Sequence, residues 1–129
     1  MKNPECLEWY NYAKMDLQAA VTLDEYTRPN PSEIICYHCQ QFAEKTLKGF
    51  LIENNNPAPR THDLSILCEM CIEIDERFKS FIDICKFLTL FGVIPRYPNE
   101  LEISESDAKR ALSYSQKIMC FFNNCGTEN

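Results

Sequence analysis

This sequence is short of glycine, of basic residues and of long apolar runs. Only three glycines occur in 129 residues, which disfavours a β-sandwich or a loop-rich fold. No apolar run approaches the roughly 20 residues that span a bilayer, and residues 1–5 lack the apolar core of a secretory signal. With 13 Lys and Arg against 19 Asp and Glu, the net charge does not favour nucleic acid. We expect a cytoplasmic protein without membrane contacts.

The hydrophobic pattern that is present predicts helices. Apolar residues recur at intervals of three and four, and proline-containing breaks separate the helical segments. The expected helices cover 4–26, 32–53, a segment capped by Thr61 or Asp63, an amphipathic fourth segment, and 104–126. The inner face of the fourth segment is expected to carry Phe78, Phe81, Ile82, Cys85, Leu88 and Phe91. Short connections between the helices favour antiparallel neighbours. We therefore expect one all-α domain over 1–129, an up-and-down antiparallel bundle of four to five helices.

The cysteines form two Cys-x-x-Cys pairs, Cys36 with Cys39 and Cys68 with Cys71, a pattern typical of zinc sites. Both pairs lie in the middle of predicted helices rather than on tight turns, so we expect no metal. His38 precedes Cys39, but adjacent helical side chains point about 100° apart, which disfavours a catalytic thiol pair. Six cysteines are expected to be reduced and buried as small apolar side chains: Cys36, Cys39, Cys68, Cys71, Cys85 and Cys120.

Asp16 interrupts the apolar stripe of the first helix, and a buried carboxylate needs a partner. Lys45, His62 and Arg96 are the available cations and donors. The resulting network either ties helices together or lines a groove for a phosphate or a base.

Two further segments carry candidate binding residues. His62 and Asp63 stand at a predicted helix start, where backbone N–H groups favour anions. Arg96 lies between two prolines and precedes Tyr97, which joins a guanidinium suited to phosphate with a ring suited to base stacking. The candidate ligand-binding residues are Asp16, Lys45, His62, Asp63, Arg96 and Tyr97.

Three segments together resemble HEPN domains, in the branch associated with nucleotidyltransferases. They read AKMDLQAA at 13–20, CYHCQQFAEKTLKGFL at 36–51 and PRTHDLSIL at 59–67, followed by RYP at 96–98. The resemblance implies a helical bundle that forms homodimers and binds nucleotides. It also implies a minimal nucleotidyltransferase as partner, in a toxin and antitoxin pair.

Many HEPN domains are metal-independent ribonucleases with an Arg-x(4-6)-His motif, and this sequence departs from it. Arg28 lies ten positions before His38, and Arg60 lies two positions before His62. The leading hypothesis is therefore a non-catalytic module, without a cofactor, that dimerises and binds a nucleotide or a nucleotidyltransferase. The alternatives are an RNase toxin with a rearranged His62 and Arg96 site, and a purely structural dimerisation domain.

Overall fold

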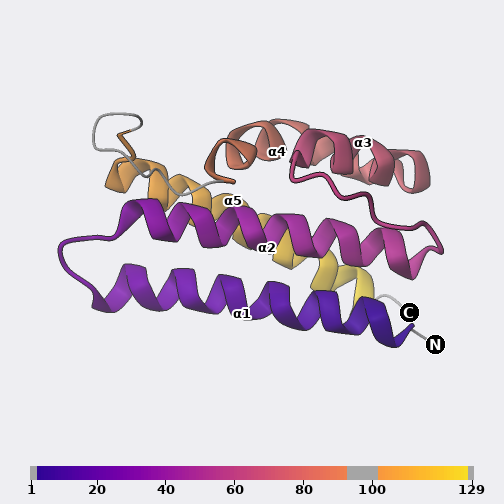
Figure 1. Cartoon of the computed structure of the whole chain (residues 1–129), viewed down its shortest axis with the longest axis horizontal. Coiled ribbons are helices and arrows are strands. Elements are labelled where there is room, and N and C mark those ends of the chain that lie inside the picture. Colours follow the sequence, from indigo (N-terminus) through magenta and orange to yellow (C-terminus); the bar gives the residue numbers. More distant parts are fainter. Residues whose placement is uncertain (1–2, 93–101, 128–129) are drawn as a thin grey trace.

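Five α-helices packed antiparallel make up the described part of the chain, which contains no strand. The computed structural model describes residues 3–92 and 102–127, with side chains to Asn124. The helices are α1 (Pro4–Tyr26), α2 (Ser32–Glu53), α3 (Leu64–Ile74), α4 (Ile82–Leu88) and α5 (Glu105–Thr127). Figure 1 shows α1 and α2 side by side along their length, with α3 and α4 along the other side of α2. The all-α antiparallel bundle is therefore confirmed.

Local capping explains where the helices begin. The Asn3 side chain accepts a hydrogen bond from the Glu5 N–H, and Pro4 follows it as the first residue of α1. Asp63, rather than Thr61, caps α3 by accepting from the Ser65 N–H. Ser104 and Asp107 bond reciprocally at the start of α5, as a capping box does. The last helix extends to Thr127, one residue beyond the expected end at Gly126.

Helix α2 is the centre of the bundle, because it packs against α1, α3, α4 and α5. It packs closely on α1 at Gly49, where an added Cβ would lie 2.8 Å from the Tyr10 ring. The Tyr10 hydroxyl in turn donates to Glu53 at 2.6 Å. Glycine is therefore required at this crossing by the space between the helices and not by backbone conformation.

The segment expected as a fourth continuous helix is divided into three pieces. A 3-10 helix, η1 (Glu76–Phe81), precedes α4, and a second, η2 (Thr89–Phe91), follows it. Buried residues three apart, such as Phe78 and Phe81, fit the three-residue turn of a 3-10 helix. Ile82, expected on the inner face, is exposed, and Ile84 is buried in its place.

Five of the six cysteines expected in the core are buried, but Cys120 is exposed. Cys120 follows the buried Ile118 by two positions, which turns its side chain about 200° around α5 and away from the core. Burial raises the pKa of the thiols of Cys36 and Cys71 to about 12. These thiols are protonated, apolar parts of the core.

Among the described residues no helix is both long enough and apolar enough to cross a membrane.

Candidate binding site

His62 lies on the connection between α2 and α3, and a buried carboxylate holds its ring. Its Nδ1 is 2.9 Å from Oε2 of Glu44 on α2. The side chain of His62 is 74% exposed, whereas that of Glu44 is only 6% exposed. Because a carboxylate accepts, Nδ1 carries the proton and donates it. The other ring nitrogen, Nε2, bonds to no described residue and is left for a ligand.

Glu44 is ionised because several donors surround it. Burial opposes its charge, but hydrogen bonds from Gln40 at 3.0 Å, from His62 and from Lys48 at 3.0 Å outweigh this effect. The pKa of Glu44 is therefore held below its usual range. Lys48 is itself buried, with 7% of its side chain exposed, so the two residues form a buried ion pair within α2.

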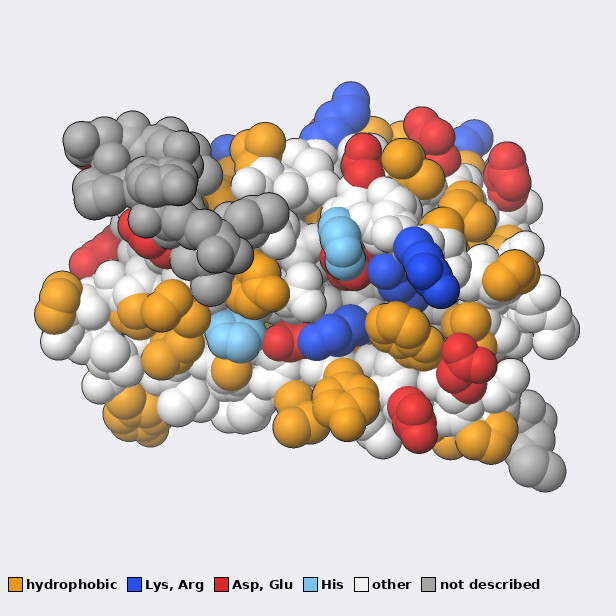
Figure 2. All heavy atoms as spheres, in the orientation of Figure 1, with side chains coloured by type: hydrophobic (Ala, Val, Ile, Leu, Met, Phe, Trp, Pro, Cys, Tyr) orange, Lys and Arg blue, Asp and Glu red, His pale blue; other side chains and the backbone are white. Residues whose placement is uncertain are grey.

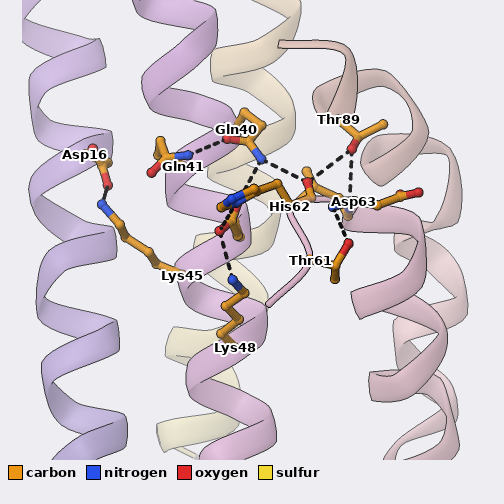
Figure 3. A network of polar contacts seen from close by, with 11 residues as sticks. Asp16, Gln40, Gln41, Lys45, Lys48, Thr61, His62, Asp63 and Thr89 are labelled. Atoms are coloured by element: carbon orange, nitrogen blue, oxygen red, sulfur yellow. Dashed lines mark hydrogen bonds and ion pairs between the residues drawn. The ribbon is translucent and has the colours of Figure 1, made fainter. Parts of the chain in front are cut away.

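The backbone of His62 is also fixed. Its carbonyl oxygen accepts from Gln40 Nε2 at 3.3 Å and from the Thr89 hydroxyl at 3.5 Å. The Thr89 hydroxyl also accepts from the Leu64 N–H at 3.0 Å. Figure 3 shows these contacts converging on His62 from α2 and from η2. Both the ring and the backbone of His62 are thus pre-positioned.

A second network joins α1 to α2 through Asp16. Lys45 donates to Oδ2 of Asp16 at 2.6 Å, and Nδ1 of His38 lies 2.9 Å from Oδ1. The Asp16 side chain is 12% exposed, so the expected need for a partner is met by two donors. The carboxylate thus bridges two side chains that lie two turns apart on α2.

Of the two expected partners of Asp16 that the structure describes, Lys45 contacts it and His62 does not. His62 is paired with Glu44 instead, and His38 takes the second oxygen of Asp16. Arg96 and Tyr97 lie outside the described residues. Asp63 is exposed, and its carboxylate is used to cap α3, where it occupies the helix end that had suggested an anion site.

Three residues of these networks were not predicted as functional candidates, Gln40, Glu44 and Lys48, and His38 was considered only as a partner of Cys39. Gln40, Glu44 and Lys48 repeat every four residues, so they form one polar stripe on α2. That spacing of four is the sequence signal that could have indicated these three residues as one group. Polar residues at this spacing are also typical of a solvent-exposed helix face, but neighbouring helices cover α2 on several sides.

A hollow of about 470 Å³ opens beside the two networks, between α1 and α2. It is lined by Glu5, Glu8, Trp9, Tyr12 and Lys45. The Lys48 ammonium, which binds Glu44, lies 5.7 Å from the centre of the Trp9 ring. Figure 2 shows both histidines on one face of the molecule, among acidic, basic and hydrophobic side chains. We call the surface around these two histidines the polar face.

The described part of the chain holds no group of three or more His, Cys, Asp or Glu residues placed to bind a metal ion. The two Cys-x-x-Cys pairs therefore do not converge on one site there.

The family model of the HEPN domain matches residues 6–125 of the chain. The match covers nearly all of the sequence, including both networks, so the chain belongs to the HEPN domain family. No curated protein and no solved structure matches it.

Proposed function

We propose that this HEPN domain is a binding module that takes the phosphate end of a nucleotide at the polar face, with His62 as the contact residue. The observation that carries the proposal is the exposed His62 ring held by the buried Glu44. In its neutral form Nε2 accepts from a ribose hydroxyl, and in its protonated form it donates to a phosphate. A ring that is already fixed loses little conformational entropy on binding.

The nearby charges support a phosphate at this position. Lys48 is buried and paired with Glu44, but Arg60, two residues before His62, is exposed. Two residues of chain span at most about 7 Å, so the Arg60 backbone is close to that of His62. A guanidinium suits phosphate, and Arg60 is such a group in the segment next to His62.

Calorimetric titration with GMP and AMP tests the proposal, alongside NMR of the imidazole C–H signals. The chain has two histidines, so the His62→Gln variant assigns the signals. We expect nucleotide to shift the His62 signal and the variant to bind at least tenfold more weakly. Lys79→Gln is the control, because Lys79 is an exposed residue of η1 that belongs to neither network. Equal binding by wild type and His62→Gln would disprove the assignment, as would an absence of binding.

A second candidate function, metal-independent RNA cleavage, is favoured by the same pair of residues. A carboxylate that orients an imidazole is a recurrent general-base arrangement. The His62 Nε2 would take the proton of a ribose 2′-hydroxyl, whose oxygen attacks the adjacent phosphate, while the 5′-oxygen leaves and takes a proton from water. The products are a 2′,3′-cyclic phosphate and a 5′-hydroxyl. Of the proposed pair, His62 with Arg96, only His62 lies within the described residues.

Incubation of the protein with a labelled single-stranded RNA in the presence of EDTA tests this candidate. Cleavage that is lost in His62→Ala and reduced in Glu44→Gln would support it. Cleavage that persists in His62→Ala would exclude His62 as the base, and RNA left intact by the wild type would leave the binding module as the function.

Membership of the HEPN family adds partners to the proposal, because HEPN domains commonly pair with nucleotidyltransferases. We include a homodimer and a minimal nucleotidyltransferase as the partners, in a toxin and antitoxin system. Exposed Met15 and Tyr26 on α1 offer apolar surface for a protein contact. Light scattering of the purified chain and co-purification with the product of a neighbouring nucleotidyltransferase gene test these two parts separately.

A further inference from the structure

We infer that the hollow beside Trp9 is a subsite for a nucleobase, and that Trp9 is the residue on which the base stacks. This inference rests on the proposed function, because it places the base of the nucleotide whose phosphate end meets His62. Neither Trp9 nor the hollow takes part in the contacts of His62.

A continuous chain of contacts joins the two positions. His62 contacts Glu44, Glu44 contacts Lys48, and the Lys48 ammonium lies over the Trp9 ring at 5.7 Å. The hollow borders the other network as well, because Lys45 both lines it and donates to Asp16. A nucleotide carries its base and its phosphate at opposite ends of the ribose, which matches an aromatic hollow next to an imidazole.

The walls of the hollow suit a base in shape and in chemistry. Trp9 is half-buried and held by α2, since its Cβ is one of the atoms closest to Gly49, whereas Tyr12 is 57% exposed. A flat base can stack on such rings regardless of its sequence identity. Glu5 and Glu8 offer carboxylate acceptors at the rim. They favour a base whose edge donates N–H groups, and guanine presents two adjacent donors.

Fluorescence provides a direct test, because Trp9 is the only tryptophan of the chain. Titration with GMP is followed both by Trp9 emission and by the His62 imidazole signal. Ribose 5-phosphate, which lacks the base, is titrated in parallel. We expect GMP to quench Trp9 and shift His62 with one common Kd. We expect ribose 5-phosphate to shift His62 alone, with binding at least tenfold weaker than that of GMP.

Two variants separate stacking from folding. Trp9→Phe retains a ring and should bind GMP within about threefold of wild type, whereas Trp9→Leu should lower GMP affinity about tenfold and leave ribose 5-phosphate affinity unchanged. Circular dichroism and urea unfolding identify a variant that has lost its fold, in which case the fluorescence titration of wild type decides. Equal affinity for GMP and ribose 5-phosphate with unchanged Trp9 emission would overturn the base subsite while leaving the phosphate site intact. No His62 shift with either ligand would overturn both.

Discussion

The imidazole of His62, about three quarters exposed to solvent, is bound through Nδ1 to Glu44, a buried carboxylate of α2. The His62 ring is held in a fixed orientation, because Glu44 is itself held by hydrogen bonds from Gln40 and Lys48. A substitution at Glu44 should therefore affect both the stability of the fold and the orientation of the His62 ring.

Glu44→Gln should destabilise the fold strongly, although it conserves shape and most hydrogen bonds. The substitution leaves the buried ammonium of Lys48 without its counter-charge. Loss of one partner of a buried ion pair costs about 3 kcal/mol or more. Urea unfolding followed by circular dichroism measures the difference. The double variant Glu44→Gln, Lys48→Met is the control and should recover most of the loss, and a single variant as stable as wild type would contradict the buried pair.

Lowering the pH should remove the contribution of Glu44 to the stability of the fold. Its pKa is lowered in the folded state, so its ionised form stabilises the fold above the ordinary pKa of about 4.3. This stabilisation is lost as pH falls through the lower, folded value. Unfolding curves of wild type and Glu44→Gln should therefore differ most near neutral pH and converge in acid. Asp75, whose pKa the adjacent Arg77 also lowers, is present in both proteins and does not affect the comparison. A constant difference across the range would exclude Glu44 as the titrating group.

Gly49→Ala should destabilise the contact between α1 and α2. Alanine is the better helix former by about 1 kcal/mol, so the substitution would stabilise an isolated α2. In the bundle the new methyl group meets two atoms of the Tyr10 ring at 2.8 and 2.9 Å, and the hydrogen bond to Glu53 restrains that ring. Overpacking of this kind costs about 1–3 kcal/mol, which exceeds the gain.

Gly92→Ala is the control for this crossing, because no atom of the described residues beyond its chain neighbours lies nearer than 3.6 Å to an added Cβ there. Thermal melting should show a lower midpoint for Gly49→Ala and little change for Gly92→Ala. A higher midpoint for Gly49→Ala would mean that Tyr10 moves aside at little cost.

Asp16→Asn should weaken the second network more mildly. Lys45 and His38 both lose a charged acceptor, but each is about one quarter exposed and can turn to water. We expect a loss of about 1–2 kcal/mol in urea unfolding, as for hydrogen bonds to a charged group. Asp83→Asn, an exposed aspartate of α4, should change stability by less than about 0.5 kcal/mol. Equal effects of the two substitutions would show that the Asp16 contacts contribute nothing.

Much of the fold follows from local sequence signals. Pro29 and Pro31 cannot continue a helix and separate α1 from α2, and Asn3, Asp63 and Ser104 begin helices by capping. The stretch after Asp75 was harder to predict, because apolar residues three apart suit an α-helix and a 3-10 helix equally well.

The site followed from the sequence only in part. An acidic residue inside an apolar stripe correctly indicated that Asp16 needs a cation, and Lys45 supplies it. The partner of His62 could not be chosen in the same way, because it depends on how the α2–α3 connection folds back onto α2. Glu44 resembles any exposed helical glutamate until the packing of α2 is known.

Because the other thiols whose side chains are described are buried, Cys120 can be labelled selectively. It is the exposed one among the cysteines whose side chains are described, and it lies on α5. In a Cys125→Ser background, a maleimide dye should attach there under native conditions and accept energy from Trp9. Spin labels at the same position would report the distance between two copies of the chain. The exposure of Cys120 on α5 therefore makes the arrangement of a dimer measurable.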